Sequence, residues 1–310
     1  MYTYYVASAI YYGSYALIPL VVISAVFAIK ITQHKYRIPF ALLCAFFMLG
    51  IYVRFIEPQI LITQYETIRF SGEQNNLTQE VSIAVFSDPH LGLYQKPYFL
   101  KKIVNTINEN HPDVVLIPGD FIYKITKQQL NTYFSQLAEI NAPVYAVTGN
   151  HDAMRPGEFS SDEVRAAVSQ YGVTFVDNTS STIQINGEKI HLYGLSDLWE
   201  GKMDQAEIQQ IKEEEHSILV IHNPDTVYKL ENTNMDLILA GHTHGGQVRI
   251  PWLYKKIIPT KYDFDRDWYD IGNSKLFITS GTGEVGLPIR FLIPPEVVII
   301  RAEIPITEDK

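Results

Sequence analysis

Residues 237–247, LILAGHTHGGQ, place two histidines one position apart directly after a short apolar run. His242 and His244 flank a threonine, and glycines stand on both sides of the pair. An apolar run of this length predicts a buried strand, and the sites of α/β proteins lie just beyond the carboxyl ends of such strands. The stretch is therefore either a surface turn that contains histidine or part of a metal site, and the rest of the chain has to decide.

The same pattern, an apolar strand that ends in polar side chains, recurs from residue 81 onward. Amphipathic helices are predicted between the strands, and in one of them Phe99, Ile103 and Ile107 share a face. This alternation indicates an α/β fold. The residues at the strand ends are Asp88, His90, Asp120, Asn150, His151, Asp152, His222, His242 and His244. So many side chains of metal-binding type at successive strand ends favour a metal site over isolated turns.

The amino-acid composition limits what can hold that metal and which partners are expected. Cys44 is the only cysteine among 310 residues, so one chain can form neither a disulfide nor a thiolate cluster. The chain has 25 Lys and Arg against 34 Asp and Glu; residues 1–70 hold five and two of these, so the remainder holds 20 and 32, a net charge of −12. A body this acidic lacks the basic surface that binds nucleic acid, so no nucleic-acid partner is expected.

Two long apolar runs near the N-terminus, residues 6–29 and 38–56, have the length of membrane-spanning helices. The first carries no charge, and the second carries only Arg54, whose long side chain can reach the headgroups. A cleaved signal peptide is disfavoured because no Lys or Arg precedes the first run and a second run follows. A buried helical hairpin is disfavoured because neither run has a polar face. We predict a two-helix membrane anchor over residues 1–62 and a folded α/β domain over residues 63–310.

The charges around the two runs predict an orientation in the membrane. Lys30, Lys35 and Arg37 lie in the connection between the runs, which the positive-inside tendency places in the cytoplasm. The domain of residues 63–310 would then face outward, from a membrane that we expect to be a bacterial inner or cytoplasmic membrane.

The order of the strand-end residues resembles the calcineurin-like metallophosphoesterase family. The motifs are Asp-x-His at 88–90, Gly-Asp at 119–120, Gly-Asn-His-Asp at 149–152, His222, and Gly-His-Thr-His at 241–244. The stretches RFIEPQILI, GHTHGGQVRIP and GTGEVGLPIRFLIPPEV are similar to the YkuE-like phosphodiesterases, a membrane-associated bacterial branch of the family. Pro89 stands where this pattern suggests leucine, and no ligand position departs from it.

The resemblance implies a four-layer α-β-β-α sandwich, with two mixed sheets packed together and helices outside. It also implies two divalent metal ions bridged by one carboxylate. Their ligands would be Asp88, His90 and His244 for the first ion, Asn150, His222 and His242 for the second, and Asp120 for both. His151 would lie over the substrate phosphate as a catalytic residue, and Asp152 would orient it.

The predicted chemistry suits these residue types. Neutral imidazole and carboxylate oxygen favour Mn, Fe or Zn over Ca. Two such ions about 3.5–4 Å apart clamp a phosphoryl group and hold a hydroxide that attacks phosphorus in line. His151 would donate a proton to the leaving oxygen or stabilise the charge on the phosphoryl group.

The sequence therefore predicts a membrane-anchored phosphoesterase that hydrolyses a phosphodiester or pyrophosphate bond. Confinement at the bilayer favours a lipid-linked or cell-envelope substrate. The alternative is a UDP-2,3-diacylglucosamine pyrophosphatase of lipid A synthesis, which requires the catalytic domain to face the cytoplasm. A non-catalytic scaffold is disfavoured because every ligand position is intact, and a nuclease is disfavoured by the acidic body.

Three features outside the motifs stay open. Residues 252–270 are rich in aromatic side chains and form a loop over the site, a contact with the bilayer, or a surface loop with its own small core. Arg290 binds a substrate phosphate or makes an ordinary salt bridge. For Trp199, a role at the site and an ordinary surface position are likewise both open.

Overall fold

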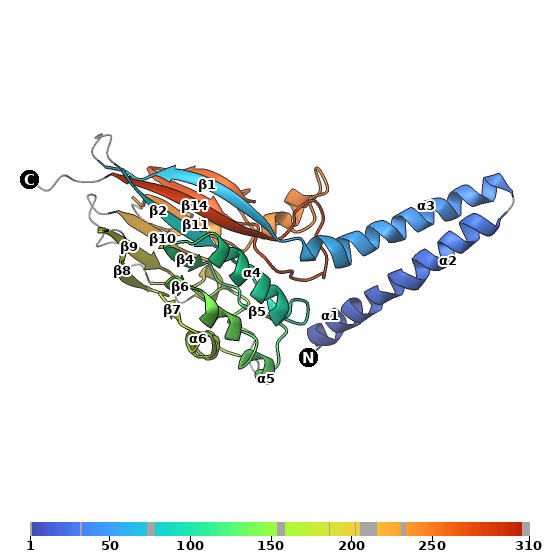
Figure 1. Ribbon diagram of the computed structural model, residues 1–310, viewed down its shortest axis with the longest axis horizontal. Coiled ribbons are helices and arrows are strands. Elements are labelled where there is room, and N and C mark those ends of the chain that lie inside the picture. Colours follow the sequence, from blue (N-terminus) through green and yellow to red (C-terminus); the bar gives the residue numbers. More distant parts are fainter. Residues whose placement is uncertain are drawn as a thin grey trace, which may run out of the picture.

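A computed structural model describes residues 2–31, 33–72, 78–153, 159–185, 187–201, 203–204, 216–230 and 234–305. The body of the protein contains two six-stranded sheets that pack against each other (Figure 1). The strand order is β1-β14-β2-β4-β6-β7 in the first sheet and β12-β13-β11-β10-β9-β8 in the second. The predicted α/β class and the pair of mixed sheets are therefore confirmed.

Strand direction brings the carboxyl ends of the central strands together. β2, β4 and β6 run parallel in the first sheet, as do β9, β10, β11 and β13 in the second. The first sheet consists of β1 (Ile62–Arg69), β2 (Thr78–Val85), β4 (Val114–Ile117), β6 (Val144–Ala146), β7 (Val173–Phe175) and β14 (Glu296–Pro305). The second consists of β8 (Thr179–Ile185), β9 (Glu188–Gly194), β10 (Ser217–Val220), β11 (Leu237–Ala240), β12 (Asp267–Ile271) and β13 (Ser274–Ile278). A small pair, β3 (Leu91–Gly92) and β5 (Ile122–Tyr123), lies in the loops that follow β2 and β4.

The core between the sheets comes from alternate residues of the buried strands, because side chains of a strand point to opposite faces in turn. In β2, Ile83 and Val85 pack with the second sheet, where Ile218 and Leu239 belong to the same buried cluster. Ala84 points the other way, into the cluster formed with the helices. Strands buried on both faces explain why their sequences are continuously apolar.

Helices cover the outer face of the first sheet. The apolar face predicted for α4 (Pro97–Glu109) is buried there, and α5 (Lys127–Leu130) and α6 (Ser161–Ser169) contribute to the same cluster. Within the described residues, the outer face of the second sheet is covered by a 3₁₀ turn, Pro224–Lys229, and by loops around Phe264. In that part of the chain the fourth layer thus differs from the helical layer of the predicted α-β-β-α sandwich.

Two long apolar helical runs precede the body, as predicted for residues 6–29 and 38–56. Figure 1 shows that α2 and α3 lie side by side and project away from the sheets. Both runs have a mean hydropathy of 2.0 and the length of a membrane span. The elements are α1 (Tyr2–Gly13), a 3₁₀ turn (Ser14–Ala16), α2 (Leu17–Lys30), α3 (His34–Ile51), a π-helical turn (Tyr52–Ile56) and a 3₁₀ turn (Glu57–Gln59). Insertion into a bilayer stays a prediction.

The bases of these helices pack on the body. Ala7 of α1 is buried against Tyr94 and Tyr123, which follow β3 and end β5. Arg54 is only 7% exposed, and its Nε donates to Ser14 Oγ at 2.9 Å. Arg54 therefore joins the two helical runs instead of reaching toward headgroups, because its guanidinium finds a hydroxyl partner within the protein.

Candidate metal centre

The side chains predicted from the motifs meet at one edge of the sandwich. Each lies in a loop after the carboxyl end of a central strand. Two residues lie in the loop after β2, one after β4, three after β6, one after β10 and two after β11. Because these strands lie side by side in the two packed sheets, their following loops converge. The residues brought together in this way are Asp88, His90, Asp120, Asn150, His151, Asp152, His222, His242 and His244.

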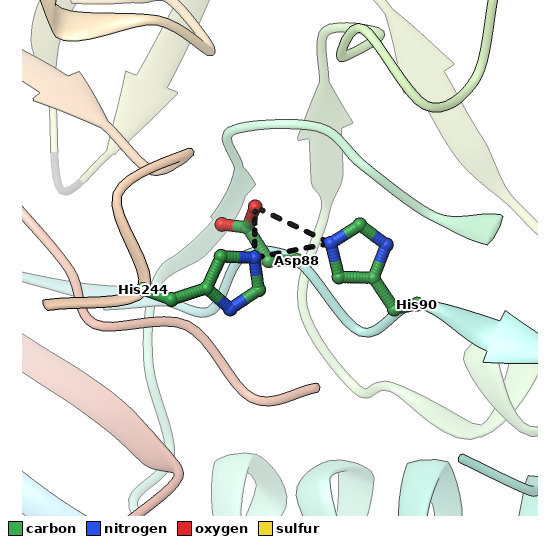
Figure 2. A group of neighbouring side chains, drawn as sticks. All are labelled: Asp88, His90 and His244. Atoms are coloured by element: carbon green, nitrogen blue, oxygen red, sulfur yellow. Dashed lines mark hydrogen bonds and ion pairs between the residues drawn. The ribbon is translucent and has the colours of Figure 1, made fainter. Parts of the chain in front are cut away.

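The first group consists of Asp88, His90 and His244, all buried (Figure 2). The Nε2 atoms of His90 and His244 lie 3.1 Å apart, and Asp88 Oδ1 lies 3.4 Å from the His244 nitrogen and 3.8 Å from the His90 nitrogen. Asp88 Oδ1 is buried and has no hydrogen-bond partner among the described residues. A buried carboxylate oxygen without a donor is costly, and a cation held by these three atoms would satisfy it.

The second group consists of His222, His242 and Asn150, with Asp120 between the two groups. His222 Nε2 lies 3.1 Å from His242 Nδ1 and 3.1 Å from Asn150 Oδ1. Asp120 Oδ2 lies 3.3 Å from His222 Nε2 and 3.5 Å from His90 Nε2. One carboxylate oxygen therefore contacts histidines of both groups, which is the position that a bridging ligand requires.

Backbone carbonyls orient two of the imidazoles. His90 Nδ1 lies 3.3 Å from the carbonyl of Ile122, and His222 Nδ1 lies 2.7 Å from the carbonyl of Pro118. A ring nitrogen that faces a carbonyl must carry a proton, so Nε2 is the nitrogen that each ring presents to the site. Metal-binding histidines are commonly held by such an outer hydrogen bond.

The loops that carry these side chains are strained. Asp88, His90, Asp120, His242 and His244 have φ between 44° and 70°, in the left-handed region. This conformation costs non-glycine residues about 1–2 kcal/mol each. Such strain persists only where surrounding contacts impose it, and it clusters at functional sites.

Glycines allow the loops to pack closely around the ligands. A Cβ atom at Gly149 would lie 2.2 Å from Asp120 Oδ1, and one at Gly241 would lie 2.4 Å from Asp88 Oδ2. Any larger residue would push the carboxylates out of place. The Gly-Asn-His-Asp and Gly-His-Thr-His motifs therefore need glycine for close approach.

Burial sets the charge of these groups. Burial lowers the pKa of His90 and of His242 to about 3, so both rings are neutral near pH 7, as metal ligands must be. Burial raises the pKa of Asp88 to about 7. Burial also lowers the pKa of His222, but the carboxylates of Asp120, Asp88 and Asp197 together outweigh burial and raise this pKa well above the usual value. The proton on His222 is thus one that a metal ion has to displace.

His151 and Asp152 occupy different positions at the site. The His151 ring lies edge-on to that of His90, with ring centres 5.1 Å apart, and its backbone N–H donates to Asp120 Oδ1 at 2.7 Å. Asp152 accepts hydrogen bonds from the backbone N–H groups of Phe121, at 2.8 Å, and Gly149, at 2.9 Å. Asp152 therefore ties the loop of Asp120 to the loop of His151, and it acts through the backbone.

Arg290 lies behind the first group. It is fully buried, and its Nη2 lies 3.5 Å from Nδ1 of His244. Its guanidinium donates to the carbonyls of Ser280 (2.9 Å), Gly281 (3.1 Å), Gly283 (2.7 and 3.1 Å) and Ile293 (3.1 Å). An enclosed guanidinium of this kind is neither a phosphate contact nor an ordinary salt bridge, so both expectations are corrected. Three of the four carbonyls belong to the stretch GTGEVGLPIRFLIPPEV, but its sequence did not indicate that the loop folds back around the guanidinium.

The remaining open features are now located. Trp199 is 57% exposed, and its ring lies edge-on to that of His242, with centres 4.7 Å apart. Tyr123, which the sequence did not single out, packs against both His90 and His151. Residues 252–270 divide in two: the first part is an exposed turn, and the second joins the core through Phe264 and ends in strand β12.

Together these distances describe a buried site of nitrogen and oxygen donors arranged as two adjoining groups, the arrangement of a metal-dependent hydrolase. A family model for calcineurin-like phosphoesterases matches residues 81–246, and the chain belongs to this family of metal-dependent phosphoesterases. The predicted family is thus confirmed.

Three relatives from bacteria illustrate the range of the family. The metallophosphoesterase YkuE of Bacillus subtilis is 32% identical over 80% of this chain and 87% of its own. The phosphodiesterase YaeI of Escherichia coli is 28% identical over 62% of this chain and 71% of its own. The UDP-2,3-diacylglucosamine pyrophosphatase LpxG of Chlamydia muridarum is 25% identical over 71% of this chain and 82% of its own.

Proposed function

We propose that this chain is a membrane-anchored phosphoesterase with a binuclear metal centre, which hydrolyses a phosphodiester or pyrophosphate bond. The observation that carries the proposal is two buried groups, Asp88 with His90 and His244, and Asp120 with His222 and His242. In each group the ligand atoms lie within 4.8 Å of one another. Asp88, His90 and His244 would hold one ion, Asn150, His222 and His242 would hold the other, and Asp120 would be shared between them. The donor set suits Mn, Fe or Zn.

Asp120 and His151 have different roles in the proposed hydrolysis. Two divalent ions supply, when bound, activation of water and neutralisation of phosphoryl charge. Asp120 keeps the two groups together, and its second oxygen is fixed by the N–H of His151. Burial lowers the pKa of His151, so its ring rests neutral near pH 7 and keeps one N–H as a donor. His151 would stabilise the phosphoryl charge through this N–H or, once its ring is protonated, donate a proton to the leaving oxygen.

The proposed anchor comprises residues 1–62, and the catalytic domain comprises residues 63–310. Support comes from the length and apolar character of the two helical runs and from the packing of Ala7 against Tyr94 and Tyr123, close to His151. A site beside the base of membrane helices favours a lipid-linked or envelope substrate. Basic residues in the connection between α2 and α3 favour a body that faces outward from a bacterial cytoplasmic membrane.

A second candidate function is the hydrolysis of UDP-2,3-diacylglucosamine. The likeness to the pyrophosphatase of Chlamydia muridarum favours it. This nucleotide lipid is a cytoplasmic substrate in lipid A synthesis, so the candidate requires the opposite topology. Protease protection of the body in inside-out and right-side-out vesicles separates the two candidates.

Hydrolysis by the detergent-purified full chain tests the proposed reaction. Protein stripped of metal is resupplied with Mn, Zn or Fe and assayed on bis-p-nitrophenyl phosphate, p-nitrophenyl phosphate and UDP-2,3-diacylglucosamine. Asp120→Asn removes the bridging charge, and Asp162→Asn, whose side chain is 75% exposed, is the matched control.

We expect metal-dependent turnover in the wild type and in Asp162→Asn, and its loss in Asp120→Asn. Preference for bis-p-nitrophenyl phosphate supports a phosphodiesterase, and preference for the nucleotide lipid supports the pyrophosphatase. Wild-type protein that binds no metal and hydrolyses none of the three would instead support a non-catalytic scaffold.

A further inference from the structure

A mostly apolar groove of about 220 Å³ begins at His242 and His244. Ile257, Val285 and Leu287 contribute its apolar walls. An apolar cavity of about 150 Å³ holds benzene, so by proportion this groove has room for roughly eight or nine carbon atoms. Because the groove starts at the metal-ligand candidates, it can receive a group that is attached to a phosphorus atom held at the metal centre.

The polar side chains of the groove wall are already used within the protein. Gln247 Nε2 donates to the carbonyls of Val285, at 3.0 Å, and Leu287, at 2.8 Å, while its Oε1 accepts the N–H of Val285 at 2.9 Å. The hydroxyl of Thr243 donates to the carbonyl of Asp265. Beyond the two imidazoles, the wall therefore offers a ligand mainly apolar surface, which suits a hydrocarbon chain better than a sugar or a peptide.

Exposed apolar side chains continue from the groove onto the protein surface. Ile257 is 64% exposed, Leu287 is 49% exposed, and Trp252, on the turn before Ile257, is 89% exposed. Lys255 and Lys256 stand between Trp252 and Ile257. Tryptophan and lysine beside apolar residues are typical of segments at the lipid headgroups, where anionic lipid attracts the basic charge.

Hydrogen bonds connect the groove to the base of α3. Val248, which lines the groove, pairs with Phe291, and the N–H of the neighbouring Arg290 donates to the carbonyl of Val53 at 2.9 Å. Figure 1 shows the orange coil after β11 beside the base of α3, at the end of the body from which the helices leave. The exposed apolar residues thus lie on the side where the proposed anchor enters the bilayer.

We propose that this groove binds an apolar chain of the substrate and receives it from the bilayer. The inference rests on the proposed phosphodiesterase function and deepens it: the substrate is a phosphoester that carries a hydrocarbon chain. Its phosphorus lies at the metal centre near His242 and His244, and the first carbons of the chain lie against Ile257 and Leu287.

A series of alkyl p-nitrophenyl phosphodiesters with methyl, butyl, octyl and dodecyl chains tests the proposal. The full chain, reconstituted in phospholipid nanodiscs and loaded with Mn²⁺, is assayed for kcat/KM on each ester. The variants are Ile257→Ser combined with Leu287→Ser, and the matched control is Leu292→Ser, which changes a 58% exposed leucine of the same loop that does not line the groove. Partitioning of longer esters into the bilayer is common to all variants, so the readout is the ratio of octyl to methyl kcat/KM.

In the wild type, kcat/KM is expected to rise by up to about fourfold for each buried methylene and to level off near eight carbons. The double variant is expected to lower the octyl-to-methyl ratio at least about tenfold, while Leu292→Ser keeps the wild-type ratio. A double variant with the wild-type ratio would overturn the groove assignment and leave phosphodiester hydrolysis intact. A metal-loaded wild type that hydrolyses none of the esters would overturn the proposed phosphodiesterase function, and the groove assignment would fall with it.

Discussion

The buried guanidinium of Arg290 allows the effect of a substitution to be worked out from its hydrogen bonds. It donates to four backbone carbonyls and is fully enclosed. Arg290→Lys keeps the charge, but a single ammonium cannot occupy the positions of Nε, Nη1 and Nη2 together. An ammonium at the Nη2 position leaves at least the carbonyl of Ile293, which Nη1 serves, without its donor, and a buried carbonyl without a donor costs about 1–3 kcal/mol. The free energy of unfolding is therefore expected to fall by at least about 1 kcal/mol.

Thermal unfolding of the detergent-solubilised, metal-loaded chain measures this loss. A decrease of about 1 kcal/mol lowers Tm by about 2–4 °C in a domain of roughly 150–250 residues. Metal content is the second readout, because Arg290 Nη2 lies 3.5 Å from Nδ1 of His244, and the variant is expected to retain less metal. The control is Arg301→Lys, since the Arg301 side chain is 58% exposed and forms only a surface ion pair.

The result that refutes this reasoning is specific. Arg290→Lys could have the same Tm as Arg301→Lys and bind as much metal as the wild type. The carbonyls of the loop around Arg290 would then not depend on the hydrogen bonds of the guanidinium. The role assigned to Arg290 would then be wrong.

Three further predictions follow from the site. Gly241→Ala places a methyl group 2.4 Å from Asp88 Oδ2, so the metal content measured by mass spectrometry should fall about tenfold or more. In the control Gly13→Ala, the new methyl group has no neighbour within 4 Å, and the metal content should not change. Because burial raises the pKa of Asp88 to about 7, metal binding below that pH must release a proton from Asp88 as well as the one on His222. Affinity by titration calorimetry should therefore fall at least about tenfold per pH unit below about 7, and a flat profile there would contradict this. Trp199→Ala removes an exposed ring that lies edge-on to His242 and that can contact a bound substrate, so KM should rise about 2–10-fold with little loss of stability. An unchanged KM would show that Trp199 does not contact the substrate.

The convergence of the candidate ligands was predictable from the sequence because it depends on strand ends. Asp88, Asp120 and His222 each follow an apolar run, and parallel strands bring such positions to one edge whatever the details of their loops. The apolar face of α4 was predictable for a similar reason, since its spacing of three and four residues defines one side of a helix.

Contacts between loops were not predictable, because they depend on conformations that the sequence pattern does not encode. Arg290 reaches the carbonyl of Ser280 and the ring of His244 only because the intervening loops turn back on themselves. The sequence predicts that Arg54 lies at the membrane interface, but in the structure its Nε donates to Ser14 Oγ, forty positions away in the chain. Among the described residues, the 3₁₀ turn over the second sheet and the strand after Phe264 likewise follow from packing that no motif predicts.

The central claim is a binuclear metal centre bridged by Asp120, and an anomalous-scattering crystal structure of the full chain with Mn²⁺ tests it most directly. The account predicts two anomalous peaks about 3.5–4 Å apart. One should contact Asp88, His90 and His244, the other should contact His222 and the remaining ligands, and Asp120 should contact both. A single peak, or two peaks that do not share Asp120, would contradict the bridged centre.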